Sequence, residues 1–292
     1  MQKITPHLWY DKEAKEAAEF YCSLFPNSKI TNVTTLHGTP SGDADIVSFE
    51  LFGQKFMAIS AGPFFKLNES ISLFAYCESD ENIEKLYNKL CEGGKVIFPL
   101  DKYDWSPKYA WVVDRFGLSW QLDVEKINNQ QKILPALLFV NDKVLKVKEA
   151  AEFYCSVFSN SKVLMEYPYD KSAGLPDGSL LFAQFKLVDY LFNAMSGQGE
   201  HKFDFNEAMS FMINCDTQEE IDYYWEKLSA VPEAEQCGWC KDKFGVSWQI
   251  VPATLGEMMS KGTREQVDRL TQAFLPMKKF NIAELEKAYK GN

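Results

Sequence analysis

The sequence predicts an α+β protein built from two copies of one domain and a C-terminal helical segment. The first observation is a pair of ten-residue segments with nearly the same pattern, DRFGLSWQLD at 114–123 and DKFGVSWQIV at 242–251. The second is a repeated helical segment, EAAEFYCSLFPNSKI at 16–30 and EAAEFYCSVFSNSKV at 149–163. The third is the order of elements, a strand, a helix and three strands, which recurs along the chain. We therefore expect domains at 1–128 and 129–255 and helices over 256–292.

The first copy contains two consecutive strand–helix–three-strand units. In the first helix, Ala17, Phe20, Tyr21, Leu24 and Phe25 recur at helical spacing and form an apolar stripe, and Pro26 ends the helix. A second helix begins near Asp80, which we expect to cap it, and ends at Gly93–Gly94. Alternating or apolar runs between turn residues predict the strands, at 2–10, 29–36, 46–52, 54–60, 71–77, 95–100, 109–114 and 119–123.

The second copy restarts after a polar linker at 124–132. Its first strand, ILPALLF at 133–139, corresponds to ITPHLWY at 4–10, and SFMINC at 210–215 corresponds to SLFAYC at 72–77. The tail has no counterpart in the first copy. It predicts one helix with Val267, Leu270 and Phe274 on one face, and a last helix that Asn281 caps.

The formal net charge of −10 argues against nucleic acid as a partner, because phosphate binding requires a basic face. No apolar run is long enough to cross a membrane, and the N-terminal residues lack the apolar core of a secretory signal. The seven cysteines are scattered and odd in number, which is typical of a reducing compartment. We therefore expect a cytoplasmic protein with neither a nucleic-acid nor a membrane partner.

The strand in each ten-residue segment separates polar from apolar side chains. Alternation places Trp120 on the core face and Gln121 on the opposite face, and Trp248 and Gln249 repeat the arrangement. We expect both Trp side chains to pack against helices. Each Gln either binds a ligand inside the domain or satisfies backbone groups at the strand end, and the sequence favours neither alternative.

Several segments resemble the PhnB-like branch of the vicinal oxygen chelate (glyoxalase and bleomycin-resistance) superfamily. They are the two repeated segments with ITPHLWY, FNEAMSF, CDTQEEIDYYWEKL and MKKFNIAELEKAY. This branch is often labelled demethylubiquinone methyltransferase-like. The resemblance covers essentially the whole chain and implies glyoxalase-like domains of paired βαβββ units, each forming a cup-shaped mixed sheet around a pocket. The superfamily contains metal-dependent enzymes and metal-free binding proteins, so the fold alone does not define a function.

The resemblance also implies where metal ligands would lie, since the superfamily's metal enzymes take them from the first, fourth, fifth and eighth strands. The residues near these positions are His7, Ser60, Ser72 and Gln121 in the first copy, and Ala136, Asn193, Ser210 and Gln249 in the second. Neutral Gln and Ser are poor ligands for a divalent transition metal. We therefore expect no metal and no other cofactor, with His7 and Gln121 as the weak candidates if a divalent metal binds. The alternative interpretation of His7 is a hydrogen-bonded strand residue.

The sequence gives little support for a redox centre or for a methyltransferase site. Cys237-Gly-Trp-Cys240 lies in a predicted strand, its first-copy counterpart has no Cys, and a thioredoxin-like motif should open a helix. A methyltransferase would need a nucleotide-type cofactor site, and the chain has no GxGxxG segment after a strand. We therefore predict neither a redox centre nor methyl transfer.

The leading hypothesis is a protein that binds a small organic molecule inside the cup, with no catalytic residue identified. The candidate pocket residues are His7, Trp9, Ser60, Ser72, Gln121, Asn193, Ser210, Trp239 and Gln249. Phe56 and Phe192 could also line it, although aromatic residues on strands are more often core. The alternatives are a metal-dependent lyase, isomerase or dioxygenase, and a dimeric scaffold with closed pockets. A homodimer is compatible with all three.

Overall fold

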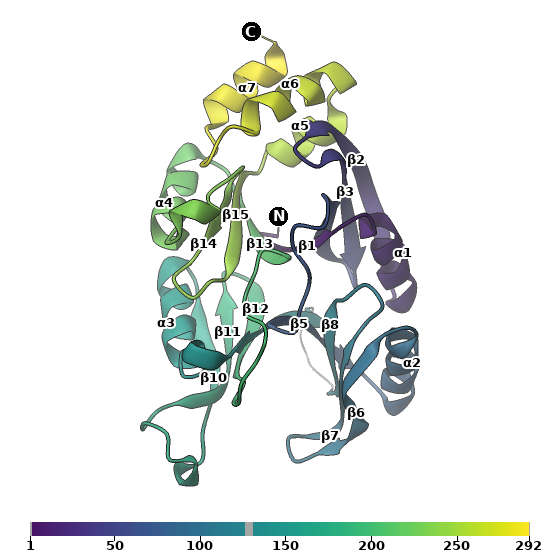
Figure 1. Ribbon diagram of the computed structural model, residues 1–292, viewed down its shortest axis with the longest axis vertical. Coiled ribbons are helices and arrows are strands. Elements are labelled where there is room, and N and C mark those ends of the chain that lie inside the picture. The colour runs from purple at the N-terminus through teal and green to yellow at the C-terminus, as the bar shows by residue number, and fades with distance from the viewer. Residues whose placement is uncertain (1, 126–130, 292) are drawn as a thin grey trace. The chain divides into compact units, whose positions relative to one another are not determined.

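Two mixed β-sheets organise the chain, and each takes strands from both sequence repeats (Figure 1). The computed structural model describes residues 2–125 and 131–291. Packing divides the chain into two compact units: unit 1 comprises Met1–Lys66 and Asn206–Asn292, and unit 2 comprises Leu67–Phe205. The predicted α+β class with mixed sheets and C-terminal helices is confirmed.

Unit 1 contains a seven-stranded sheet in the order β14-β15-β13-β1-β4-β3-β2. Its strands are β1 (Ile4–Tyr10), β2 (Lys29–Thr39), β3 (Gly42–Leu51), β4 (Gln54–Ser60), β13 (Met209–Cys215), β14 (Trp239–Lys241) and β15 (Ser247–Pro252). Its helices are α1 (Ala14–Leu24), α4 (Gln218–Leu228), α5 (Leu255–Lys261), α6 (Arg264–Phe274) and α7 (Ile282–Lys290). The antiparallel pair β1–β13 lies at the centre and joins the two repeats.

Unit 2 contains an eight-stranded sheet in the order β10-β11-β12-β9-β5-β8-β7-β6. Its strands are β5 (Ile71–Cys77), β6 (Lys95–Tyr103), β7 (Ser106–Val113), β8 (Ser119–Val124), β9 (Ile133–Phe139), β10 (Lys162–Pro168), β11 (Leu180–Leu187) and β12 (Tyr190–Ser196). Its helices are α2 (Asp80–Cys91) and α3 (Val147–Val157). The central antiparallel pair is β5–β9, which again joins the two repeats.

The expected organisation of one cup per repeat is therefore wrong. The boundaries 1–128 and 129–255 delimit sequence repeats, whereas each compact unit combines a βαβββ module from one repeat with a module from the other. The reason is that both copies carry the same strand pattern. A strand such as β1 buries the same face whichever copy supplies its neighbour, so local sequence does not specify the partner.

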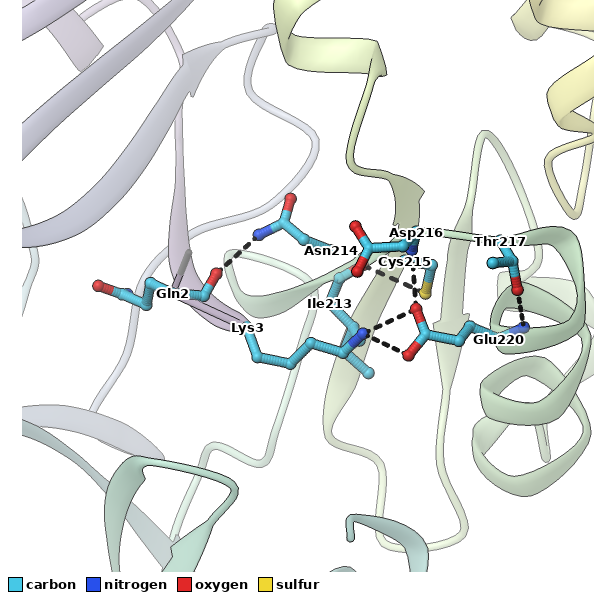
Figure 2. Close-up of polar contacts among 8 residues, drawn as sticks. All are labelled: Gln2, Lys3, Ile213, Asn214, Cys215, Asp216, Thr217 and Glu220. Atoms are coloured by element: carbon cyan, nitrogen blue, oxygen red, sulfur yellow. Dashed lines mark hydrogen bonds and ion pairs between the residues drawn. The ribbon is translucent and has the colours of Figure 1, made fainter. Parts of the chain in front are cut away.

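Figure 2 shows the junction of the two repeats in unit 1. Lys3, just before β1, reaches the first turn of α4 and forms an ion pair with Glu220, with 2.9 Å between Nζ and Oε1. Asn214 on β13 donates its side-chain N–H to the Gln2 carbonyl. Glu220 also accepts the backbone N–H of Asp216. The Lys3–Glu220 and Asn214–Gln2 contacts connect the beginning of the chain to residues more than two hundred positions away, and they reinforce the β1–β13 pairing.

The helices cover one face of each sheet, which we call the outer face; the opposite face is the inner face. In unit 1, α1 and α4 lie on the outer face, and in unit 2, α2 and α3 do (Figure 1). Trp120 and Trp248 are buried on the outer faces, 0% and 1% exposed, as predicted. Phe56 and Phe192 are buried there too, stacked on Phe49 and Phe185. Their alternative assignment to a pocket is therefore wrong.

A buried carboxylate holds each of the two ten-residue segments together by the same three hydrogen bonds. Asp114 accepts the backbone N–H groups of Phe116 and Leu118 through one oxygen, and the Trp120 indole N–H at 2.9 Å through the other. Asp242 makes the equivalent three bonds in the second copy. One side chain thus closes the glycine turn and fixes the indole that fills the core.

The C-terminal segment forms three helices and links both edges of the unit 1 sheet. Helices α5 and α6 pack on β2, and the carbonyls of Met277 and Lys278 accept backbone N–H groups from Cys237 and Gly238 beside β14. Thr263 caps α6 and Asn281 caps α7, the latter as predicted. The cap of α2 is Ser79 rather than Asp80. Within the described residues, no helix is both long and apolar enough to cross a membrane.

Candidate functional site

The inner face of unit 1 brings five predicted site residues together. Strand register places His7 opposite Ser210, and Ser210 lies one strand from Gln249, whose amide donates to the Ser210 hydroxyl at 2.9 Å. Trp239 is opposite Gln249 on the next strand, and its ring contacts His7 edge-on with 5.5 Å between centroids. Trp9 follows two residues after His7 on the same face, with its centroid 6.1 Å from that of Trp239.

His7 is a buried imidazole with one unsatisfied ring nitrogen. Its side chain is 3% exposed, and Nδ1 has no hydrogen-bond partner among the described residues. Burial lowers the pKa of His7 to about 3, so the ring is neutral at physiological pH. The alternative prediction of a hydrogen-bonded strand residue does not hold for Nδ1. A neutral imidazole here can offer one donor and one acceptor to a ligand.

The inner face of unit 2 carries Ser72 and Gln121 on the neighbouring strands β5 and β8, and Asn193 on β12, which β9 separates from β5. Gln121 donates to the Ser72 hydroxyl at 2.6 Å and accepts from the Tyr109 hydroxyl at 2.6 Å. Gln121 and Gln249 are 1% and 7% exposed, and their amides bond to side chains of the inner face. Each Gln is therefore part of a polar network on that face, rather than a cap for backbone groups at the strand end.

Asn193 is the second buried polar side chain whose donor lacks a hydrogen bond of good geometry, and the Tyr76 hydroxyl is the group near its amide. It lies beside Ala136 on the sheet, is 0% exposed, and accepts the Gln184 amide at 3.0 Å. Its Nδ2 makes no hydrogen bond of good geometry within the described part of the chain. The Tyr76 hydroxyl is nearby. Burial raises the pKa of Tyr76 to about 12, and the side-chain amides of Asn193 and Gln184 lower it by a smaller amount.

One predicted residue is misplaced along its strand. Ser60 lies at the end of β4, where its hydroxyl accepts the backbone N–H of Ala14 at the start of α1. The residue beside His7 is Met57, in the register position that Asn193 occupies beside Ala136. Ser60 therefore corresponds to Ser196 and not to Asn193. The repeat carried the signal for this three-residue offset, because FMAIS at 56–60 aligns with FNAMS at 192–196 and places Met57, not Ser60, at the position of Asn193.

The inner-face positions do not fit a transition-metal site in either unit. They hold His7, Met57, Ser210 and Gln249 in unit 1, and Ala136, Asn193, Ser72 and Gln121 in unit 2. The first set has one imidazole and no carboxylate, and the second has neither. His7 and Gln121, the weak metal candidates, lie in different units. The described residues contain no group of three or more His, Cys, Asp or Glu side chains suited to a metal.

Sequence reasoning missed an aromatic group on the inner face of unit 2. Its rings come from β5, β6, β7 and the β6–β7 turn, and each contacts at least one other: Phe74, Tyr76, Phe98, Tyr103, Trp105, Tyr109 and Trp111. We call these seven residues the aromatic face. The available signal was alternation, because Phe74 and Tyr76 share the side of β5 that carries Ser72.

Burial affects both cysteines of Cys237-Gly-Trp-Cys240. Cys237 lies in a turn before β14, and both thiols are free in the structure. Burial raises the pKa of both thiols, which disfavours the reactive thiolate.

Paired βαβββ modules that form mixed sheets with helices on one face define the glyoxalase-like, vicinal oxygen chelate fold. The solved structure of glyoxalase I from Zea mays shares this fold with a TM-score of 0.54; the match covers 86% of this chain and 94% of that one at 11% identity.

The chain belongs to the family described as 3-demethylubiquinone-9 3-methyltransferase, which matches residues 2–123 and 131–251 in two tandem copies. The PhnB protein from Bacillus cereus is 34% identical over 42% of this chain and 100% of its own, with a TM-score of 0.40. No curated protein matches this chain.

Proposed function

We propose that this protein binds small organic molecules on the inner faces of its two sheets. The observation that supports the proposal is shared by both units: a buried polar side chain on the inner face keeps an unused nitrogen. In unit 1 this is His7 Nδ1, which has no partner among the described residues, and in unit 2 it is Asn193 Nδ2, which forms no hydrogen bond of good geometry among them and has the Tyr76 hydroxyl nearby. The two side chains lie in equivalent cross-strand pairs of the two units. His7 is on β1 beside Met57 of β4, and Asn193 is on β12 beside Ala136 of β9. Buried polar groups are almost always paired, so a ligand atom is a natural partner for each.

The surroundings define the chemistry of such a ligand. In unit 1 the rings of Trp9 and Trp239 flank His7, and neutral Gln249 and Ser210 supply the neighbouring polar atoms. Aromatic surface favours a flat, largely apolar molecule, and a neutral imidazole with an amide favours uncharged polar substituents. This site therefore suits an uncharged heterocycle or aromatic amide.

The metal-dependent alternatives have less support, because the inner-face donors do not fit a transition metal. Methyl transfer has less support as well. The order strand–helix–three strands does not provide the glycine-rich turn and helix N-terminus that hold a nucleotide-type cofactor in a doubly wound sheet. The family description does not by itself transfer that reaction to this chain.

Replacing His7 tests the proposal. In His7→Leu the unpaired nitrogen is lost at similar side-chain size, so the free energy of unfolding of the ligand-free protein should rise by about 1 kcal/mol. The second repeat carries Ala136 at the equivalent position, which shows that an apolar residue suits the fold there. Aromatic amides that raise the melting temperature of the wild type should lose this effect in His7→Leu.

The outcome that contradicts the proposal for unit 1 is a destabilised His7→Leu protein with an unchanged ligand response. Imidazole burial would then serve the fold alone. Ser60→Ala is the matched control, because Ser60 was a pocket candidate but its hydroxyl binds the start of α1. Its ligand response should equal that of the wild type.

A further inference from the structure

A carboxylate without a basic partner among the described residues lies within the aromatic face of unit 2. Asp123 on β8 is paired with Tyr76 on one neighbouring strand and with Tyr109 on the other. Next along the strands, Gln121 lies between Phe74 and Trp111. Because these residues share one side of their strands, the carboxyl group is bordered by aromatic rings on both sides.

Asp123 has little to balance its charge. Its side chain is half-buried, and it accepts a hydrogen bond from the Ser106 hydroxyl. No basic side chain of the described residues forms an ion pair with it. The other titratable groups around it are Glu125, Tyr76, Tyr109 and Cys77. Burial raises the pKa of Asp123 to about 6, so it is mostly ionised at neutral pH.

One edge of the aromatic face is reachable from solvent, whereas Phe74 and Tyr109 are buried in the core of unit 2. Trp105, next to Ser106, is 62% exposed, and its ring stacks on Tyr103 with 5.0 Å between centroids. Phe98 is 36% exposed and stacks on Trp111 at 5.9 Å. Ring faces attract cations, and a carboxylate among them adds a full negative charge. The two features together favour a flat organic molecule that carries a positive charge.

We propose that the aromatic face of unit 2 binds a small planar organic cation at its exposed edge, with Asp123 as its counter-ion and the rings of Phe98, Trp105 and Trp111 as its walls. This inference rests on the proposed function and adds a charge class to one of its two sites. Unit 1 lacks the feature, because Val251 stands at the position equivalent to Asp123 in the second repeat. The two sites therefore differ in the charge of the ligand they prefer.

The test uses three bicyclic probes of similar size: N-methylquinolinium as a permanent cation, quinoline as a neutral molecule at neutral pH, and 2-naphthoate as an anion. Titrations follow the indole N–H signals of protein labelled with ¹⁵N-tryptophan. Trp105 and Trp111 report on unit 2, and Trp239 reports on unit 1. We expect the cation to bind unit 2 about tenfold more tightly than quinoline does, and the anion to bind weakest.

The variants separate charge from shape. Asp123→Asn keeps an acceptor for Ser106, and it should weaken the cation about tenfold while leaving quinoline within about twofold. In the wild type, cation affinity should fall as the pH drops through about 6, and this dependence should vanish in Asp123→Asn. Trp105→Ala changes an exposed side chain and should weaken both the cation and quinoline.

Two results would overturn the inference, and they are distinguishable. If the cation and quinoline bind unit 2 with equal affinity and Asp123→Asn changes neither affinity, the assignment of Asp123 as a counter-ion is wrong. The proposal that unit 2 binds small molecules would still stand. If no probe shifts Trp105 or Trp111 at millimolar concentration, unit 2 is not a site for planar ligands at all. The Trp239 signal would then show separately whether unit 1 binds.

Discussion

At the residue scale, Asp123 shows the conflict between stability and binding most clearly. A half-buried carboxylate without a basic partner costs free energy when it is ionised. Its folded-state pKa of about 6 lies above its usual value, so the folded protein holds the proton more tightly than the unfolded chain does. The contribution of Asp123 is therefore favourable below about pH 4 and is lost as the pH rises through about 6. A residue that destabilises the fold at neutral pH is a reasonable candidate for a functional role.

The resulting prediction is that Asp123→Asn stabilises the ligand-free protein at alkaline pH. We expect the free energy of unfolding to rise by about 1–2 kcal/mol near pH 8, a value reduced from the full pKa shift because the side chain is only half-buried. Near pH 4 the gain should disappear. Urea denaturation at the two pH values measures both quantities. A loss of stability near pH 8 would mean that the carboxylate has a stabilising partner.

The same scale shows what the sequence could predict. Alternation along β8 and β15 correctly assigned Trp120, Trp248, Gln121 and Gln249 to their faces, since side-chain direction follows directly from strand period. It did not show that Ser72 and Tyr109 would satisfy Gln121. Those contacts depend on the register between strands that are distant in the sequence, and a single strand does not encode it.

At the element scale, the junction between β14 and the C-terminal helices depends on one glycine. Gly238 has a φ of +80°, and a Cβ at this position would lie 2.7 Å from the Phe280 ring. Its backbone N–H is also bound by the Lys278 carbonyl. The tail approaches β14 this closely only because the residue has no side chain.

Gly238→Ala should therefore cost about 2–3 kcal/mol of unfolding free energy and loosen the tail. The matched control is Gly53→Ala, because Gly53 has a φ of +75° and a Cβ there would meet no described atom within 4 Å. Both variants strain the backbone, so the difference between them measures the close contacts of a Cβ at Gly238 with the Phe280 ring and with the Ile250 carbonyl of β15. Limited proteolysis should cut Gly238→Ala faster than Gly53→Ala in the C-terminal segment. Equal cutting and equal stability would mean that the tail does not depend on this contact.

The helices and the order of elements were the most predictable parts at this scale. The cap of α7 follows from Asn281, a local signal. The α1 stripe was correct at Ala17 and Tyr21, whereas Phe20 and Leu24 are half-buried and Ala14 and Ala18 complete the buried face. The correspondence of Met57 with Asn193 was missed, although the alignment of FMAIS at 56–60 with FNAMS at 192–196 indicates it and the strand register agrees. The aromatic face was also missed, because its rings come from three strands and a turn.

At the scale of the whole molecule, the two repeats are interleaved. Each central strand pair, β1–β13 and β5–β9, joins one repeat to the other. A repeat on its own would leave β1 and β5 with one unpaired edge each, and neither sheet would be complete. The sequence showed the duplication, but similar copies cannot indicate which copy supplies the partner strand.

The two repeats expressed as separate fragments should therefore depend on each other. Residues 1–125 and 131–292 should co-purify as a one-to-one complex, and either fragment alone should self-associate or remain unfolded. Size-exclusion chromatography and circular dichroism of the fragments, alone and mixed, measure this. Two stable, folded monomers that ignore each other would contradict the interleaved arrangement.

The most direct test of small-molecule binding compares the tryptophans of the two sheet faces. Trp9, Trp111 and Trp239 lie on inner faces, whereas Trp120 and Trp248 are buried on outer faces with their N–H groups bound by Asp114 and Asp242. With ¹⁵N-tryptophan-labelled protein and a library of small aromatic amides, heterocycles and organic cations, we predict that binding molecules shift the inner-face indole signals and leave the outer-face signals in place. A library in which no molecule moves an inner-face indole, or in which Trp120 and Trp248 move most, would contradict the account.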